Sequence, residues 1–471
     1  MTQTSARSRS LPPPMSRSNP CRCVRGAVGQ APTWEHLRYV FIIAFITMLW
    51  LTPNPNAVSF RDDPSAGREG TAFIQAIWFA LLSFGLFATM DRWREVARQF
   101  DITILLLIGW CAVTTVFALD PEVSVRRLLF TLICMMSMFL AVSGLKRLDA
   151  FIWILLGMCV IEVITKYFFV FAIPSLGIHK PTGAEPALAG LWKGQYVHKN
   201  AAGAVCAIQM ILFYATRRLI SPLLMLPMIV LDLIFFIKSG SKTPLILFIC
   251  MMLLSSFLLR LRSGLAIMLI VLSGLAFLNI VTLASVVSDD ARFIAQKLIG
   301  DSTFTGRVEI WRFLMHYSTQ EPWIGAGFQS FWQIGNLSPA QSEGSNWVVQ
   351  AVYGHQGFLD TVVMIGYTGL ILLLLFAVVR PSFDLERISN RDKPLLEMFV
   401  SFWLFGLFTN GTESVFLGRA DATWLFCIAG IVGIRRYVLE ENASRALVPR
   451  TGPPPLTAQA VVIPAAGTRF G

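Results

Sequence analysis

Two side chains of this sequence, an imidazole and a guanidinium, are suited to acid–base chemistry and to anion binding. His355 stands in the segment Gly354–Gly357, directly before an apolar run. Histidine titrates near neutral pH, so it can act there as a base; the alternative is an interfacial histidine satisfied by solvent. Arg307 precedes Trp311 by one helical turn. Its forked donors suit a diphosphate, although a solvated helix with Trp311 at a membrane interface explains the same spacing.

A second polar group precedes an apolar run further upstream. Gln195, His198, Lys199 and Asn200 lie together at the expected start of a helix. The amide groups and the positive dipole end of such a helix attract an anion. Capping by Asn200, with Lys199 extending toward the membrane surface, explains these residues equally well.

Several further charged residues lie in or beside apolar runs. The segment Ser239–Thr243 resembles part of a phosphate loop, but it lacks the upstream glycine and the preceding strand that a nucleotide site needs. Lys242 in this turn is expected to line a polar cavity. Glu162 and Lys166 are four residues apart and are expected to neutralise each other. Asp360 follows His355 closely and is expected to support that site, because a charge inside a bilayer must face protein or water.

The composition requires that lipid solvate most of the chain. Of the 471 residues, 55% are hydrophobic and 14% are charged, whereas soluble proteins carry about 25% charged residues. So few charges cannot cover a water-soluble protein, which excludes a purely globular cytosolic enzyme. The net charge of +11 comes from Lys and Arg placed between apolar runs. That pattern is typical of membrane proteins, so nucleic acid is not an expected partner and membrane lipid is.

Twelve apolar runs predict an all-α, polytopic membrane protein of about twelve transmembrane helices. A helix needs roughly 17–25 residues to cross the hydrocarbon core, and most of the runs approach this length. They lie at 39–51, 71–90, 102–119, 128–145, 150–173, 200–216, 219–237, 244–260, 264–285, 358–379, 395–410 and 421–435.

The distribution of Lys and Arg predicts that both termini are cytoplasmic. With the N-terminus inside, the short loops on that side carry more basic residues than those on the outer side, as the positive-inside rule requires. Four of the five histidines, His179, His198, His316 and His355, then fall on the outer side. We therefore expect the chemistry to take place at the outer face.

This topology divides the chain into five predicted regions. Their boundaries are a disordered cytoplasmic tail at 1–37, nine transmembrane helices at 38–285, a periplasmic loop domain at 286–357, three transmembrane helices at 358–437, and a second disordered tail at 438–471. Within the loop, Thr305 suits the N-cap of a helix that runs through Tyr317 and ends before Pro322. An ordered loop of this length is usually functional.

The motifs of the loop and its flanks, in this order, resemble the O-antigen ligase/polymerase superfamily, and within it the exopolysaccharide polymerases of the ExoQ type. The resemblance covers roughly residues 100–435. The segments that carry it are Thr305–Trp311, Pro322–Gly327, Gly354–Asp360 and Ile365–Leu370, together with Gln195–Asn200 and Ser239–Thr243 upstream. One departure is Gln356, where the family usually has asparagine after the histidine.

The resemblance implies a GT-C-related glycosyltransferase of the bacterial inner membrane. Such an enzyme transfers a glycan from an undecaprenyl-diphosphate carrier to a sugar hydroxyl of an acceptor glycan at the periplasmic face. Arg307 would then bind the diphosphate, and His355 would act as the base or position the acceptor. Lys199 and Arg127 are further candidates for the anionic lipid head. A separate chain-length co-polymerase is the implied protein partner.

The sequence alone is compatible with three functions. A polymerase and an O-antigen ligase acting on lipid A core share the donor and differ only in the acceptor. A secondary transporter with twelve helices accommodates the charged residues Glu162 and Asp232 equally well, although no internal repeat is evident. The transferase needs no cofactor, and because the loop has no evident metal-binding motif, we expect transfer without a metal ion.

Overall fold

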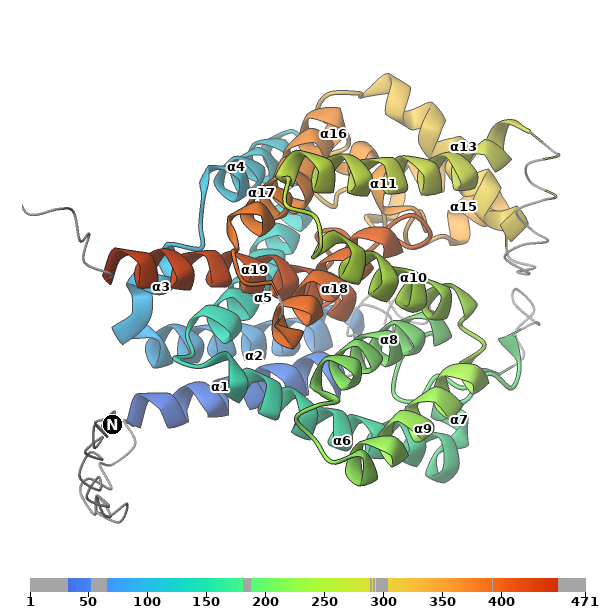
Figure 1. Cartoon of the computed structure of the whole chain (residues 1–471). Helices are drawn as coiled ribbons and strands as arrows, with labels where there is room; N and C mark the ends of the chain where they lie inside the picture. Colours follow the sequence, from blue (N-terminus) through green and yellow to red (C-terminus); the bar gives the residue numbers. More distant parts are fainter. Residues whose placement is uncertain are drawn as a thin grey trace, which may run out of the picture.

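The computed structural model is a bundle of helices (Figure 1). It describes residues 33–51, 66–180, 188–288, 304–391 and 393–447, with residues 290 and 293. Within these ranges there is no β-sheet, and the one β-bridge joins Ile178 to Trp192. The prediction of an all-α membrane protein is confirmed.

Each of the twelve predicted apolar runs coincides with a helix. In chain order these helices are α1 (Thr33–Trp50), α2 (Ala66–Ala88), α4 (Ile102–Val116), α5 (Pro121–Ser143), α6 (Leu148–Ala172), α8 (Lys199–Thr216), α9 (Pro222–Ser239), α10 (Lys242–Leu258), α11 (Gly264–Val287), α16 (Gly357–Leu374), α18 (Pro394–Thr409) and α19 (Ala422–Leu447). Short helices α3 (Trp93–Ala97) and α7 (Pro174–Gly177) lie in connections, and α17 (Arg380–Arg387) continues α16 through a π-helical turn.

By helix length and composition, fewer helices qualify as membrane crossings than the predicted twelve. Among the described helices, six are long and apolar enough to span a bilayer, and a seventh is reached if α2 and the bent helix after it form one span. The helices α4, α10 and α18 are apolar but shorter. The helical runs are therefore confirmed, whereas twelve crossings are not.

Side chains and backbone at the helix ends explain where several helices start and stop. Asp101 accepts hydrogen bonds from the backbone at the start of α4, and Asp120 does so at the start of α5, directly before Pro121. Gly240, with φ of 62°, ends α9 in the left-handed conformation that glycine adopts without a steric cost. The turn predicted at Ser239–Thr243 is thus a tight connection between α9 and α10.

A fully buried ionic cluster lies inside the bundle, where α6, α8 and α9 meet. The Lys166 Nζ lies 3.1 Å from Glu162 Oε2 and 3.0 Å from Gln209 Oε1, and it also forms an ion pair with Asp232. The Lys166, Glu162 and Asp232 side chains have no exposed area. The predicted pairing of Glu162 with Lys166 is confirmed, and the tertiary structure adds Asp232. We call Glu162, Lys166 and Asp232 the buried triad.

The long segment between α11 and α16 contains helices and has its own apolar core. It includes α13 (Phe304–Gln320), α14 (Pro339–Ser342) and α15 (Asn346–Gln350). Trp311, Leu314 and Phe331 are buried in a cluster separate from the main core. The predicted helix is present, but Thr305 lies inside it rather than at its N-cap, because the helix begins at Phe304.

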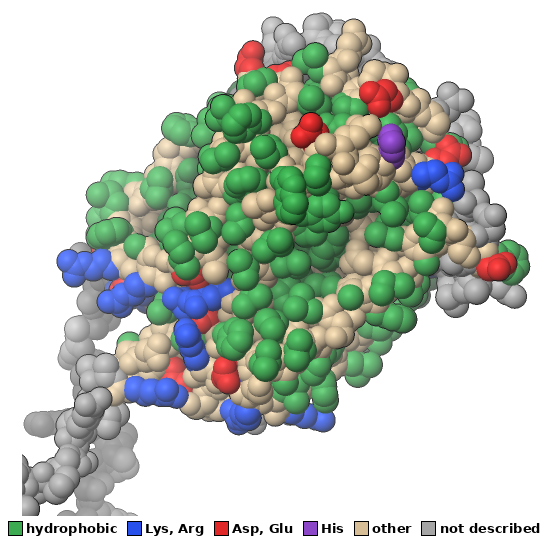
Figure 2. Space-filling model, turned by 90° about the horizontal axis from the view of Figure 1, so that it is seen from above, with side chains coloured by type: hydrophobic (Ala, Val, Ile, Leu, Met, Phe, Trp, Pro, Cys, Tyr) green, Lys and Arg blue, Asp and Glu red, His purple; other side chains and the backbone are tan. Residues whose placement is uncertain are grey.

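The two predicted tails are mostly outside the described residues. Helix α1 begins at Thr33 and α19 continues to Leu447, so each helix extends into the range predicted as a tail. Residues 1–32 and 448–471 lie outside the described ranges. Figure 2 shows most of the visible Lys and Arg side chains at one end of the molecule. This asymmetry accords with the positive-inside pattern, and the orientation in the membrane stays a prediction.

Candidate functional site

The structure brings Arg307 and His355 together on one carboxylate, that of Glu413. Arg307 Nη2 lies 3.1 Å from Glu413 Oε1, and His355 Nδ1 lies 3.2 Å from Glu413 Oε2. Arg307 comes from α13, His355 precedes α16, and Glu413 lies between α18 and α19. The three side chains are 16%, 24% and 15% exposed respectively. They therefore form a site that is largely enclosed and still reaches solvent.

The start of α8 supplies two more members of this site. Asn200 Nδ2 donates to Glu413 Oε1 over 2.7 Å, and its Oδ1 lies 3.5 Å from Ser241 Oγ. His198 caps α8 by accepting from the Asn200 backbone N–H over 3.2 Å. The cap is thus His198, while the Asn200 side chain faces Glu413. The positive end of the α8 dipole lies beside an anion, as expected for a helix N-terminus. We call Arg307, His355, Glu413, Asn200 and His198 the outer cluster.

The two upstream histidines are neutral at physiological pH. Burial, followed by the charge of Lys193, lowers the pKa of His179 to about 4. Burial also lowers the pKa of His198 to about 4, although the Glu413 carboxylate opposes this shift. His179 Nε2 accepts from the Lys199 backbone N–H over 3.1 Å. Each imidazole uses one nitrogen to hold the first turn of α8, and a proton on that nitrogen would break the contact.

Glu413 is ionised despite its enclosure. Burial raises the pKa of its carboxyl group. The Arg307 charge and the hydrogen bond from His355 outweigh this effect and lower the pKa to about 2. An ionised carboxylate can only accept hydrogen bonds, so His355 donates its Nδ1–H. In a neutral imidazole this leaves Nε2 as the basic nitrogen. The site thus holds the histidine in the tautomer that a proton acceptor needs.

A network behind His355 fixes its backbone. His355 has φ of 53°, a left-handed conformation that non-glycine residues adopt rarely and often at functional sites. Asp360 accepts from the Gly354 backbone N–H over 2.7 Å and from Trp332 Nε1 over 2.9 Å. Gln356 caps α16 by accepting from the Leu359 backbone N–H. Asp360 and Gln356, both predicted for the site, therefore hold the segment that carries His355.

The glycines on either side of His355 allow a close approach. A β-carbon at Gly354 would lie 2.6 Å from Asp360 Oδ1, and one at Gly357 would lie 2.0 Å from Asn410 Oδ1. Neither position has space for a larger residue. The glycine spacing in this motif therefore reflects packing of the segment between α13 and α18.

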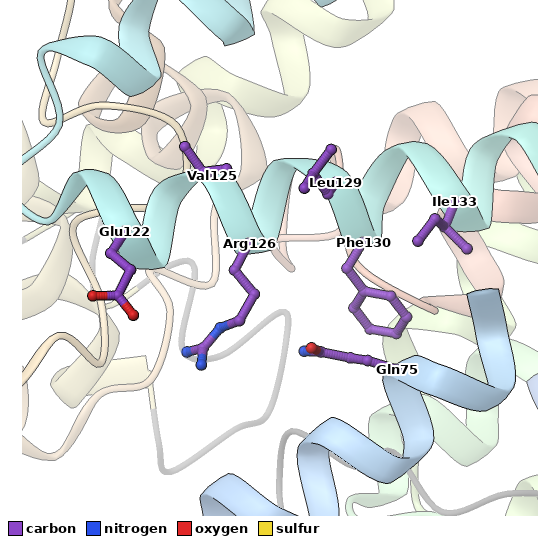
Figure 3. Close-up of a pocket in the computed structure, with 7 residues that line it drawn as sticks. All are labelled: Gln75, Glu122, Val125, Arg126, Leu129, Phe130 and Ile133. Carbon is purple, nitrogen blue, oxygen red and sulfur yellow. The ribbon is translucent and has the colours of Figure 1, made fainter.

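Arg127 lies outside the outer cluster. Its guanidinium donates to the backbone carbonyls of Trp332 (2.8 Å) and Gln333 (2.9 Å) and also to Gln329. Arg127 is buried, so it anchors the loop that positions Trp332 against Asp360. Its neighbour Arg126 instead lines a groove of about 490 Å³ between α5 and α2 (Figure 3), which contains none of the outer-cluster residues.

The two predicted lysines flank the same end of the bundle. Lys199 is the first residue of α8 and lies between His198 and Asn200. Lys242 is the first residue of α10 and is exposed. It lies next to Ser241, whose Oγ is 3.5 Å from Asn200 Oδ1. The turn predicted to line a polar cavity is thus adjacent to Asn200, and its lysine side chain faces solvent.

Glu413 is the residue that the sequence reasoning did not assign to the site. It is an acidic residue just after the apolar run at 395–410. The predicted topology places the loop after the run at 395–410 on the same outer side as His355, which is a signal that was available. Its role as the common partner of Arg307, His355 and Asn200 depends on contacts across 58 to 213 residues of sequence, which no local pattern reveals.

Comparison with known proteins agrees with the motifs. Residues 224–374 match the O-antigen ligase family, and this range contains Arg307, His355, Gln356 and Asp360. A stretch of 96 residues is 31% identical to the exopolysaccharide production protein ExoQ of Rhizobium meliloti (strain 1021). That match covers 20% of this chain and 22% of ExoQ, so it spans less than a quarter of either protein. The resemblance drawn from the motifs is confirmed: residues 224–374 are similar to the O-antigen ligase family, and a shorter stretch is similar to ExoQ.

Proposed function

We propose that this protein is a membrane glycosyltransferase of the polysaccharide polymerase or ligase type, which takes a glycan from an undecaprenyl-diphosphate carrier at the periplasmic face. The observation that carries the proposal is that Arg307 and His355 meet on Glu413 within one partly exposed cluster. An anion-binding guanidinium and a basic imidazole in the same cluster are what transfer from a diphosphate requires.

Each of the two predicted catalytic residues has a role in this reaction. The acceptor hydroxyl attacks the anomeric carbon while His355 Nε2 takes its proton. The bond between that carbon and the diphosphate oxygen breaks, and the electron pair leaves on the diphosphate. Arg307 stabilises this charge, and a fixed donor aimed at the developing anion costs no reorganisation during the reaction. Attack opposite the leaving group inverts the anomeric centre.

The remaining predicted residues have supporting roles. Asn200, Lys199 and His198 lie at the start of α8 and complete the anion site. Lys242 follows Ser241, whose Oγ lies 3.5 Å from Asn200 Oδ1. Gln356 and Asp360 hold the His355 segment. Arg127 binds three backbone carbonyls, so we assign it to anchoring the loop rather than to the lipid head.

The location of the site agrees with a membrane-bound donor and an acceptor in the periplasm. With the N- and C-termini in the cytoplasm, the loop domain and the outer cluster face the periplasm of the inner membrane. The donor then lies in the outer leaflet with its diphosphate at the level of α8. A separate co-polymerase that controls chain length is the protein partner that the family resemblance implies.

The central experiment measures consumption of lipid-linked glycan by the purified full chain in lipid nanodiscs. Arg307→Ala and His355→Ala are each expected to lower transfer by a factor of about 100 or more. Arg312→Ala and His316→Ala are matched controls, because both side chains are exposed on the same helix α13. Full activity in either Arg307→Ala or His355→Ala, with the chain folded, would refute the assignment.

The acceptor separates a polymerase from a ligase. Deleting the gene and sizing the lipid-linked glycans distinguishes the two: single repeat units on the carrier indicate a polymerase, and long chains left on the carrier indicate a ligase. The transporter alternative has one structural observation in its favour, a buried ionic triad of the kind found in ion-coupled carriers. Proton-driven uptake that depends on Glu162 or Asp232 would support the transporter.

A further inference from the structure

The outer cluster is an anion site that the protein fills with its own carboxylate. Arg307 Nη2, Asn200 Nδ2 and His355 Nδ1 converge on Glu413 within 2.7–3.2 Å, and the cluster lies at the N-terminus of α8. Carboxylates and phosphates use the same charge-assisted donors. A diphosphate that approaches Arg307 therefore competes with Glu413 for the same guanidinium.

We propose that the donor diphosphate displaces Glu413 from Arg307, and that the released carboxylate then serves as the counter-charge of the His355 imidazolium. This inference rests on the proposed function and adds a coupling between donor binding and proton transfer. Glu413 is thereby a positioning residue, since it acts on the acceptor through His355.

The groups around Glu413 explain why the carboxylate would leave Arg307 and keep His355. In the structure its single negative charge faces Arg307 from α13, His355 from before α16 and His198 from before α8. The Arg307 charge is the strongest influence that keeps this carboxyl ionised, and it lowers its pKa to about 2 against the effect of burial. A carboxylate neutralised by a guanidinium is a poor partner for an imidazolium. Once the diphosphate takes over Arg307, Glu413 keeps His355 and Asn200 as its partners.

The transfer step can be written with every proton, bond and charge accounted for. The proton of the acceptor hydroxyl moves to His355 Nε2, and the imidazolium charge is offset by Glu413 at Nδ1. The anomeric carbon exchanges its bond to the diphosphate oxygen for a bond to the acceptor oxygen, and the diphosphate leaves with the electron pair beside Arg307. His355 and Glu413 are already hydrogen-bonded in the free protein, but there Arg307 shares the carboxylate. Because the donor releases Glu413 from Arg307, the full negative charge of Glu413 is available to His355 only in the donor complex.

Binding of inorganic pyrophosphate to the full chain in nanodiscs tests the exchange without any transfer reaction. Glu413→Gln removes the competing charge and is expected to bind pyrophosphate about tenfold more tightly than the wild type, as expected when a competing state is removed. Arg307→Gln should bind it far more weakly. Glu321→Gln is the matched control, because Glu321 is exposed at the end of α13. Equal affinities of wild type and Glu413→Gln would overturn the exchange.

Steady-state kinetics test the second half of the proposal. Glu413→Gln should lower kcat by about a hundredfold while the KM for the donor falls, and Glu413→Asp should restore part of kcat. A purely structural role would change neither parameter selectively. If neither the wild type nor Glu413→Gln binds pyrophosphate, the assignment of the donor site fails. If both bind it equally and Glu413→Gln still transfers glycan at the wild-type rate, only the exchange fails.

Discussion

The buried triad and the outer cluster use similar side chains for different purposes. In the triad, the single cation Lys166 pairs with two carboxylates, Glu162 and Asp232, and no part of the three side chains is exposed. In the outer cluster, one carboxylate is shared by Arg307, His355 and Asn200, and the ionic members are 15–24% exposed. The buried triad is enclosed where three helices pack together, and its charged members pair with one another. The outer cluster opens toward solvent and draws its members from connecting segments and helix ends.

This difference separates a structural ionic cluster from one that can bind a substrate. Buried charges are costly unless they are paired, and Lys166 already contacts both carboxylates of the triad, so an added anion would have to break one of these pairs. The outer cluster contains partners that another anion can replace. Fold stability should therefore depend strongly on the triad and weakly on the outer cluster, whereas transfer should show the opposite dependence.

The largest predicted effect on stability is that of Lys166→Met. This substitution leaves Glu162 and Asp232 buried without a cation, and removing one partner of a buried ion pair typically costs about 3–5 kcal/mol. Thermal unfolding in detergent should show the loss, with Lys242→Met as the control at an exposed lysine. An unchanged unfolding temperature in Lys166→Met would mean that the triad does not support the fold.

Arg127→Met should have an intermediate effect. It removes hydrogen bonds from one guanidinium to three backbone carbonyls. Because the three bonds share one charged group, their contributions do not add, and we expect a total loss of roughly 1.5–3 kcal/mol. The unfolding temperature should fall whether or not anionic lipid is present in the nanodisc. A loss that appears only with anionic lipid in the nanodisc would instead assign Arg127 to the lipid head.

Arg307→Met should affect stability least among the three cation substitutions. The ion pair with Glu413 is largely enclosed, but Glu413 keeps Asn200 and His355 as partners when Arg307 is removed. We therefore expect a loss of about 1–2 kcal/mol, between the values for exposed and for buried pairs. The unfolding temperature should stay close to that of the wild type while glycan transfer is lost. A destabilisation as large as that of Lys166→Met would remove the distinction between the two clusters.

The last predicted effect is absent at neutral pH and appears only on acidification: a pH dependence of stability that arises at the start of α8. The pKa of His198 is lowered to about 4 by burial, so the unfolded chain binds more protons than the folded chain between pH 4 and the ordinary histidine range. Stability should therefore decrease as the pH falls through this window. His198→Asn keeps an N-cap side chain and should reduce this slope in unfolding measured at several pH values; an identical slope would exclude His198 as its origin.

The fold class and the helical segments could be predicted because their causes are local. A continuous apolar run reveals a membrane helix without knowledge of its neighbours, and each of the twelve runs coincides with a helix. The pairing of Glu162 with Lys166 was also local, since residues four apart share a helix face. Arg307 and His355 stood out because their residue types and glycine-rich surroundings point to chemistry.

What the sequence could not reveal is which of these side chains share a partner. Asp232 is 66 residues from Lys166 in the chain, and Glu413 is 106 residues from Arg307, so neither pairing leaves a periodic signal. Arg127 could not be separated from the site candidates for the same reason, because its loop carbonyls are about 200 residues away. Local hydrophobicity and spacing determined the helices and the candidate residues. Only the packing of distant helices decided that one carboxylate joins the guanidinium to the imidazole, because a long-range ionic contact depends on where helix ends meet in space.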